Sequence, residues 1–277
     1  MLETLRLNDR GGSVRVLQER LKALGYAVAV DGAFGPATDR AVRAFQTSKG
    51  LTVDGIVGRG TWSALGVKPV EKERIGLDDY VECAKILGVK PAAVRAVAEV
   101  EVMGDSFLPD GRCKILFERH WFYKQFIIPR KPGQTTASLI AERKKIQDAH
   151  PNICNPSRGG YKGNAAEYPR LELARSFSDT AALEAASYGM FQIMGFNAVD
   201  VCKYPSVQEF YRLMQLGEPQ QLEAFIRFIK GKPRAWAALK DLNWAVFAEV
   251  YNGSAYAEHN YHGRMAAAFK KYEPIFA

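Results

Sequence analysis

A short repeat near the amino terminus places the strongest constraint on the fold of this chain. Residues 31–38 read DGAFGPAT and residues 54–61 read DGIVGRGT, so both copies follow the pattern D-G-x-Φ-G-x-x-T, in which Φ is an apolar residue. An Asp-Gly pair favours a tight turn, and the closing threonines, Thr38 and Thr61, can each cap a following helix. The repeat therefore predicts two similar units of turn and helix within one small module.

Helices on both sides of the first turn complete this module. Apolar residues recur with helical spacing over 14–24, and Gly25 then ends that helix. A second amphipathic helix, with Phe45 on its inner face, lies between the two turns and ends near Gly50. Together these segments predict a three-helix domain over residues 1–66.

This module resembles the family of peptidoglycan-binding type 1 domains over residues 8–66. The segments that carry the resemblance are 13–18, 24–26, the two turns of the repeat, 44–46 and 61–62. The resemblance implies that the domain attaches non-covalently to the bacterial cell wall. As contacts with the wall polymer we consider Tyr26, Asp31 and Arg59, although most residues of the pattern serve the fold alone.

A charged segment over 67–76, which contains one proline, predicts a short linker to a second and larger domain over 77–277. The periodicity of apolar residues predicts that this domain is mainly α. Helices are expected over 78–87, 91–103, 136–149, 180–196, 205–216, 218–231, 233–240, 241–251 and 261–271. A strand is expected over 114–118, and irregular segments are expected over 128–135 and 150–170.

The helix expected over 91–103 carries a carboxylate on its apolar face. Glu101 continues an apolar stripe, whereas Glu99 points roughly 200° away around the helix. The stripe consists of Val94, Val97 and Ala98. Desolvation and the negative end of the helix dipole both raise the pKa of a carboxyl placed there. A carboxylic acid that stays protonated near neutral pH suits general acid catalysis, and the alternative is a structural glutamate bonded to an arginine or a backbone amide.

Two further segments carry groups that suit a sugar. Gly189 lies within the helix expected over 180–196 and costs about 1 kcal/mol relative to alanine, which indicates a close approach by another group. Amide side chains hydrogen-bond sugar hydroxyls and N-acetyl groups, and aromatic faces pack on sugar rings. The candidate substrate contacts are Tyr188, Met190, Gln192, Tyr251 and Asn252.

Together these segments resemble the lysozyme-like superfamily, and most closely the N-acetylmuramidase domain of modular phage endolysins. The segments that carry the resemblance are 98–101, 104–111, 115–120, 159–161, 188–195 and 251–253. The resemblance implies a lysozyme-like α+β fold that is mainly helical with a small β element. It also implies cleavage of the β-1,4 bond between N-acetylmuramic acid and N-acetylglucosamine, with Glu101 protonating the leaving oxygen in an oxocarbenium-like transition state.

The second carboxylate of such a reaction stays open at this point. Glu118 follows the expected strand and is a candidate for a direct catalytic role, while Asp105 and Asp110 are nearer to Glu101 in sequence. Glu118 can instead be structural and paired with Arg119 or another cation. Two other functions also remain open. A lytic transglycosylase needs only one acid, and a non-catalytic wall-binding or virion structural protein needs none.

The remaining expectations concern partners and location. The net charge of +8 favours an anionic polymer such as the cell wall, and no nucleic-acid motif is present. No secretory signal opens the chain, and no run of about 18 apolar residues predicts a membrane span. An endolysin of this kind is expected to stay in the host cytoplasm until a holin-type membrane permeabiliser releases it to the wall, and to act as a monomer.

Neither a cofactor nor a metal is expected. The four histidines lack the carboxylate or cysteine pattern of a zinc set, which argues against a zinc-dependent wall amidase. The four cysteines, at positions 83, 113, 154 and 202, form no C-x-x-C pair and have no activating context, so we expect free and mostly buried thiols rather than a nucleophile.

Overall fold

The computed structural model describes residues 4–66, 72–102, 104–108 and 110–277, without the side chains at positions 12, 59, 254 and 255. The chain divides into two compact units, Met1–Glu71 with Phe107–Arg112, and Lys72–Ser106 with Cys113–Ala277. The predicted boundaries at 66 and 76 stay predictions. Within the described ranges, no helix has both the length and the apolar character that a bilayer span requires.

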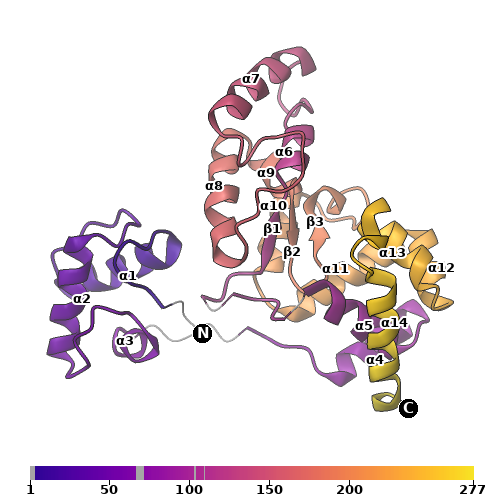
Figure 1. The fold of residues 1–277 in the computed structure, drawn as a ribbon, viewed down its shortest axis with the longest axis horizontal. Helices are drawn as coiled ribbons and strands as arrows, with labels where there is room; N and C mark the ends of the chain where they lie inside the picture. Colours follow the sequence, from indigo (N-terminus) through magenta and orange to yellow (C-terminus); the bar gives the residue numbers. More distant parts are fainter. Residues whose placement is uncertain (1–3, 67–71, 103, 109) are drawn as a thin grey trace. The chain divides into compact units, whose positions relative to one another are not determined.

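The first unit contains the three predicted helices, α1 (Gly12–Ala23), α2 (Pro36–Ser48) and α3 (Arg59–Ala64) (Figure 1). Apolar residues from all three helices and from the turns between them form one core. Its buried members are Leu5, Val14, Leu17, Leu21, Phe34, Ala41, Val42, Phe45, Val57, Trp62 and Leu65. The helical periodicity read from the sequence therefore identified the inner faces of α1 and α2, except that Leu24 lies beyond α1 and is 51% exposed.

A buried glutamine holds the first turn of the repeat. The side-chain Nε2 of Gln18 donates to Asp31 Oδ1 (2.8 Å), to the carbonyl of Ala33 (3.0 Å) and to Thr38 Oγ1 (3.1 Å). Its Oε1 accepts from the backbone N–H of Gly32 (2.8 Å). One side chain thus satisfies most of the polar groups that the turn would otherwise bury unpaired.

The second copy of the repeat uses Gln46 in the same way. Its Nε2 donates to Asp54 Oδ1 (2.8 Å), to the carbonyl of Ile56 (2.9 Å) and to Thr61 Oγ1 (3.3 Å). Its Oε1 accepts from the N–H of Gly55 (3.0 Å). Each copy of the repeat therefore forms a turn whose polar groups are hydrogen-bonded to a glutamine from the preceding helix.

This arrangement corrects the expected role of the threonines. Helices α2 and α3 follow Gly35 and Gly58, which have no capping side chain, so Thr38 and Thr61 lie inside the first helical turn. Both threonines are buried and bond to the glutamines instead of capping.

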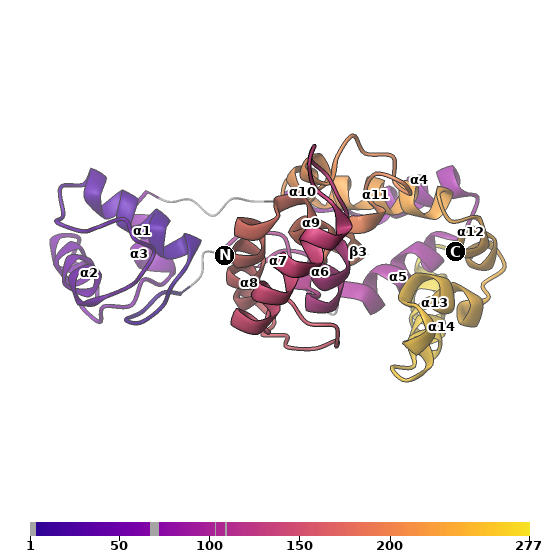
Figure 2. The ribbon, with the colours of Figure 1, turned by 90° about the horizontal axis from the view of Figure 1, so that it is seen from above.

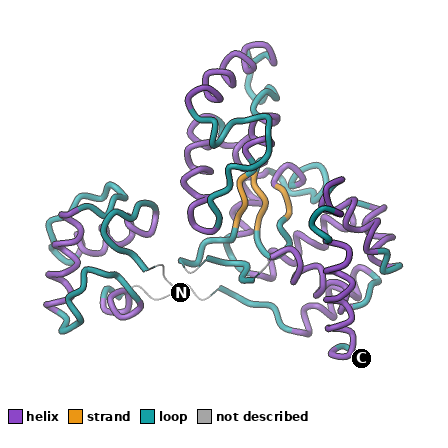
Figure 3. The backbone as a smooth tube through the Cα atoms, in the orientation of Figure 1, coloured by secondary structure: helices purple, strands orange, loops and turns teal. Residues whose placement is uncertain are grey.

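The second unit is a set of helices around a small antiparallel sheet (Figures 1 and 3). Its α-helices are α4 (Leu77–Leu87), α5 (Pro91–Val102), α6 (Arg119–Gln125), α7 (Thr136–Ala149), α8 (Glu167–Phe177), α9 (Asp179–Glu184), α10 (Val207–Met214), α11 (Glu218–Lys230), α12 (Pro233–Lys240), α13 (Trp244–Asn252) and α14 (Tyr261–Tyr272). The sheet has the order β1 (Ile115–Phe117), β2 (Ala186–Tyr188), β3 (Ile193–Met194). The predicted mainly helical class with a small β element is confirmed.

The sheet lies between two groups of helices. Helix α8 packs on β1, α6 packs on α9, and α11 packs on β3. Helix α11 also packs on α4, and in this second group α5 lies between α4 and α14 (Figure 2). Residues of α5 are buried around almost its whole circumference, so this helix is the centre of the second unit.

The expected helix over 180–196 is wrong beyond residue 184. Helix α9 ends at Glu184, and the chain then forms the β2–β3 hairpin, in which Ser187 pairs with Met194. The apolar run fits either structure by periodicity alone, and close contacts of its glycines decide for the hairpin. Helices α6 and α8 were also not expected, because their buried positions are few and include charged residues.

The described part of the expected linker belongs to the second unit. Glu73 forms a bridge with Gly217, and Arg74 donates to Glu218 Oε1 (2.8 Å). Residues 67–71 lie outside the described part of the chain. The four cysteines are free and buried, and burial raises the pKa of each thiol.

We predict that Gln18→Leu destabilises the first unit by about 2 kcal/mol or more, because the turn then contains several buried polar groups without partners. Hydrogen exchange of the full-length protein, read by mass spectrometry on peptides from residues 4–66, measures this loss. Gln46→Leu should have a similar effect on the same peptides. Unchanged protection in both variants would contradict the structural role of the glutamines.

Candidate active site

Helix α5 places Glu101 at its last turn. Pro91 opens the helix, where a missing N–H costs nothing, and an alanine- and valine-rich sequence lets neighbouring helices approach closely. The helix ends at Val102, and Gly104 has a φ of 120°. Glu101 therefore lies in the last turn of the most buried helix of the unit, one residue before that helix ends.

The surroundings of Glu101 favour its protonated form. Protein atoms crowd the carboxyl, and this desolvation raises the pKa of Glu101 to about 7. A hydrogen bond from Asn252 Nδ2 to Glu101 Oε1 (2.8 Å) and the positive charge of Arg264 offset part of that effect. The direction of the shift is the one predicted from the apolar stripe.

Glu99, two residues earlier on the same helix, has the opposite environment. Desolvation acts to raise the pKa of Glu99, but hydrogen bonds from Lys271 (2.6 Å) and Tyr272 outweigh it, so the pKa is lowered. One helix thus presents a neutral acid on one face and a paired carboxylate on the other, as the spacing predicted.

A cavity of about 240 Å³ adjoins the acid. It is lined by Trp121, Arg158, Gln192, Ile193, Met194, Phe196, Asn197, Phe228, Lys232, Val250, Tyr251, Asn252 and Gly253. Asn252 connects this cavity to the acid, because it lines the cavity and donates to Glu101. The structure thus brings together three of the five predicted substrate contacts: Gln192, Tyr251 and Asn252.

Each of these three residues also makes hydrogen bonds within the protein. The hydroxyl of Tyr251 donates to the carbonyl of Phe191 (2.6 Å), which joins α13 to the hairpin. Gln192, with a φ of 46°, donates to the carbonyl of Gly189 (2.8 Å) and accepts from Ser187 Oγ (2.7 Å). By contrast, Oδ1 of Asn252 is buried and has no hydrogen-bond partner among the described residues.

The hairpin turn explains why position 189 is glycine. Gly189 has a φ of 70°, and a Cβ there would lie 2.4 Å from the side-chain carbon Cδ of Gln221. Gln221, from α11, accepts from the N–H of Met190 (2.7 Å) and donates to the carbonyl of Met214 (3.1 Å). The close approach inferred from the sequence is therefore that of a protein side chain, and no local pattern pointed to Gln221.

The structure does not bring Tyr188 and Met190 to the cavity. Tyr188 is 1% exposed, packs on Phe210 and donates its hydroxyl to the carbonyl of Leu183 (2.8 Å). Met190 is buried and its sulfur accepts from Tyr80 (3.6 Å). Both side chains therefore belong to the core rather than to the groove.

Glu118 precedes helix α6 and is occupied by two neighbours. Its oxygens accept from the hydroxyl of Tyr161 at 3.0 and 2.8 Å, and Nδ1 of His120 lies 3.0 Å from Oε2 without the geometry of a hydrogen bond. Burial and the charge of Glu118 raise the pKa of Tyr161 to about 12, so the phenol keeps its proton. The salt bridge expected with Arg119 is not formed.

Arg119 instead fastens the irregular segment that follows α7. Its guanidinium donates to the carbonyls of Pro151 (3.3 Å), Ser157 (3.0 Å) and Arg158 (2.8 Å). Three backbone carbonyls bound to one side chain fix the course of this loop. Residues 150–160 were recognised as irregular, but the sequence did not indicate which side chain holds them.

A buried ion pair fastens the remainder of the loop. Glu167 and Arg170 are 0% and 4% exposed at their side chains and contact each other. Glu167 also accepts from the N–H groups of Gly163 (2.8 Å) and Phe117 (3.2 Å), and Arg170 donates to the carbonyl of Asn152 (2.8 Å). The i, i+3 spacing of the pair was visible in the sequence, but its burial was not.

The predicted wall contacts of the first unit have structural partners of their own. Asp31 accepts from Gln18 and from the N–H of Ala33 (2.8 Å), and Tyr26 shares a hydrogen bond with Ser48 Oγ (3.0 Å). The side chain of Arg59 lies outside the described part of the chain. A wall-binding role of these three residues stays a prediction.

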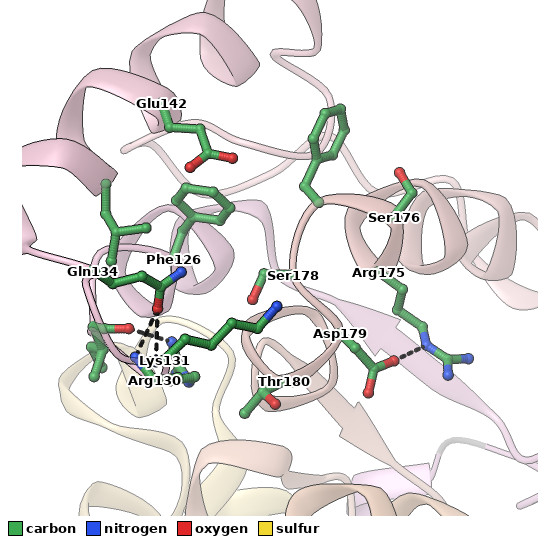
Figure 4. A pocket seen from close by; sticks show the side chains of 13 residues that line it. Phe126, Arg130, Lys131, Gln134, Glu142, Arg175, Ser176, Ser178, Asp179 and Thr180 are labelled. Atoms are coloured by element: carbon green, nitrogen blue, oxygen red, sulfur yellow. Dashed lines mark hydrogen bonds and ion pairs between the residues drawn. The ribbon is translucent and has the colours of Figure 1, made fainter.

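A second cavity of about 400 Å³ lies at the end of α6 and at the junction of α8 and α9 (Figure 4). Polar side chains line it, among them Lys131, Arg175 and Asp179, and Figure 4 shows the ion pair of Arg175 with Asp179. None of the predicted site residues lines this cavity. Among the residues that the structure describes, no three His, Cys, Asp or Glu side chains gather as a metal set.

A carboxyl with a raised pKa close to a cavity with aromatic lining, in a helical unit with a small sheet, is the arrangement expected of a lysozyme-like glycosidase. The family model of N-acetylmuramidases matches residues 90–273, and a peptidoglycan-binding domain model matches residues 10–65. The chain belongs to the N-acetylmuramidase family of glycoside hydrolases.

Three individual proteins are similar to all or part of this chain. The crystal structure of the Burkholderia AP3 phage endolysin is 44% identical, with a TM-score of 0.63, over 98% of this chain and 100% of that chain. A zinc D-Ala-D-Ala carboxypeptidase of Streptomyces albus G is 43% identical over 65 residues, and an uncharacterized protein of Kitasatospora aureofaciens is 50% identical over 60 residues. The chain spans only 26% and 51% of the lengths of these two curated relatives.

We predict that activity falls as the pH rises through about 7, because the acid form of Glu101 is the reactive one and its pKa is about 7. Asn252→Ala removes a hydrogen bond that favours the ionised form, so the alkaline limb should move to higher pH. The pH profile of kcat/KM on purified cell wall measures both effects. A limb that stays in place, or moves to lower pH, would contradict this account of Glu101.

Proposed function

We propose that this chain cleaves the β-1,4 bond between N-acetylmuramic acid and N-acetylglucosamine in peptidoglycan, with Glu101 as the general acid. The observation that carries the proposal is the raised pKa of Glu101 beside the cavity that Asn252 lines. Family membership and the likeness to a phage endolysin support the choice of substrate.

The chemistry of Glu101 follows from its surroundings. The protonated carboxyl gives its proton to the bridging oxygen as the glycosidic bond breaks, and positive charge develops on the sugar ring. The carboxylate that results keeps the hydrogen bond from Asn252 and the nearby charge of Arg264, which limit the cost of ionisation. Oδ1 of Asn252 has no hydrogen-bond partner among the described residues, but it is buried, so it can accept from a sugar hydroxyl or an N-acetyl N–H only if neighbouring side chains move when substrate binds.

For Glu118 we propose the structural alternative. Both its oxygens accept from Tyr161, and it does not line the cavity that contains Asn252. Because Tyr161 lies next to the glycine pair at 159 and 160, Glu118 anchors the loop that Arg119 also holds. A direct catalytic role for Glu118 is the alternative that mutation must test.

Lytic transglycosylase action is a second candidate. The described lining of the cavity includes no carboxylate. Hydrolysis with a second carboxylate requires that group about 5–9.5 Å from the acid, whereas an intramolecular attack by the sugar's own hydroxyl requires only the acid. The lack of a carboxylate in the described lining therefore supports transglycosylation as the competing reaction.

We further propose that the first unit holds the enzyme on the wall and that the protein serves host lysis. The peptidoglycan-binding match over residues 10–65 and the similarity to an endolysin support this. In that role the protein acts as a monomer from the host cytoplasm and depends on a holin-type membrane permeabiliser. A non-catalytic wall-binding or virion protein is the reading that remains if the purified chain releases nothing from cell walls.

We predict that Glu101→Gln lowers the rate of wall cleavage by about 10²- to 10⁴-fold, because the amide cannot donate the acid proton. Clearing of outer-membrane-stripped cells gives the rate, and mass spectrometry of the products gives the bond. Hydrolysis releases reducing muramic acid ends, and transglycosylation releases 1,6-anhydromuramic ends. Released peptides with intact glycan would exclude both reactions.

Glu99→Gln is the matched control, since it makes the same change on the same helix at a carboxylate bonded to Lys271. It should keep most of the activity. Glu118→Gln should lower activity by less than about tenfold, which is the effect of loosening a loop anchor. A loss as deep as that of Glu101→Gln would make Glu118 the second catalytic carboxylate, and full activity of Glu101→Gln would refute the acid assignment.

A further inference from the structure

Two positive charges stand in the cavity beside the acid without an anionic partner. Arg158 and Lys232 line the cavity of about 240 Å³, and its described lining contains no aspartate or glutamate. Neither residue takes part in any ion pair among the described residues, whereas Arg130, Arg170 and Arg175 of the same unit are each paired with a carboxylate. The cavity therefore carries a net positive charge that the protein itself does not neutralise.

Hydrogen bonds hold the backbone at Arg158, so the loop segment that carries its charge has a defined position. Arg119 donates to the carbonyls of Ser157 (3.0 Å) and Arg158 (2.8 Å). Tyr161, three residues further, is tied to Glu118. The loop is therefore hydrogen-bonded on both sides of the exposed Arg158. Such an arrangement suits a side chain that binds a ligand.

Lys232 is placed by the start of helix α12. Its carbonyl accepts from the N–H of Trp236 (2.9 Å), and its own N–H donates to the carbonyl of Ile229 (3.0 Å). Its ammonium lies 6.0 Å from the ring centroid of Phe228, which also lines the cavity. The two cations thus come from separate elements, the loop before α8 and the start of α12, and both line the same cavity.

The groove makes these charges effective because much of its lining is neutral. Trp121, Phe196 and Phe228 contribute aromatic surface, and Asn252 connects the groove to Glu101 through a bond of 2.8 Å. The lining is mixed, and its neutral polar side chains, Gln192, Asn197 and Asn252, bring no negative charge that would weaken the attraction for an anion. A guanidinium and an ammonium together suit a carboxylate, which the guanidinium binds with two parallel hydrogen bonds.

We propose that Arg158 and Lys232 bind a carboxylate of the muramoyl side of the substrate and so select peptidoglycan over neutral chitin-like glycans. This inference rests on the proposed cleavage of peptidoglycan. In intact wall the carboxylate comes from the peptide stem, because the lactyl group of muramic acid is held in an amide bond. In glycan strands stripped of peptide, the lactyl carboxylate itself is free.

The test compares Arg158→Gln/Lys232→Gln with the wild type on two walls: native cell wall, and the same wall with its carboxylates converted to neutral amides. The double variant should lose about tenfold or more in kcat/KM on native wall, mainly through KM, and should equal the wild type on amidated wall. Lys85→Gln/Lys145→Gln is the control, because it removes the same charge from exposed positions on α4 and α7.

Each outcome has a distinct meaning. An equal loss on both walls, or an equal loss in the control variant, would overturn the inference and leave the proposed function intact. Failure of the proposed function itself is visible separately, as undiminished activity of Glu101→Gln. A loss on native wall assigns a carboxylate of the peptide stem, because the lactyl group is amide-bonded there, and a loss on peptide-free strands shows that the two cations also bind the free lactyl carboxylate.

Discussion

The second unit depends on the desolvation of one carboxyl at the end of a buried helix. Residues of α5 are buried on nearly every side between α4 and α14. The carboxyl of a glutamate in its last turn is therefore removed from water, whether or not it has a hydrogen-bond or ion-pair partner. The pKa of Glu101, raised from 4.5 to about 7, corresponds to about 3 kcal/mol in favour of the neutral acid. The helix core thus supplies the protonation state that the chemistry needs.

The other parts of this unit place groups around that carboxyl. The last residue of α13 supplies the amide that bonds Glu101, and Tyr251 fixes α13 to the hairpin. On the far side of the groove, the long loop before α8 owes its course to Arg119 and to the buried pair of Glu167 and Arg170. Removing one member of such a buried pair typically costs about 3–5 kcal/mol, so loss of Glu167 or Arg170 is expected to destabilise this loop.

The sequence allowed prediction wherever local periodicity decides the structure. Helices α1 and α2, α5 with its two differently directed glutamates, and the strand β1 were expected from spacing, and α3 was expected from the repeat, whereas β2 and β3 lie in a segment that was expected to be helical. Prediction failed where a distant side chain decides. The hairpin after α9 requires Gln221 against Gly189, and the repeat turns require Gln18 and Gln46, whose contacts span many residues of chain. Tyr188 fits a sugar-binding motif by residue type, but the tertiary fold buries it.

The direct test of this account is the titration of Glu101 itself. Carbon-13 NMR of a protein labelled at its glutamate carboxyls, with the signal assigned by its absence in Glu101→Gln, reports the pKa without any catalytic assay. An apparent pKa of about 7 is the expected result. Titration near the ordinary value of 4.5 would show that the carboxyl is ionised at neutral pH and would contradict its assignment as the general acid.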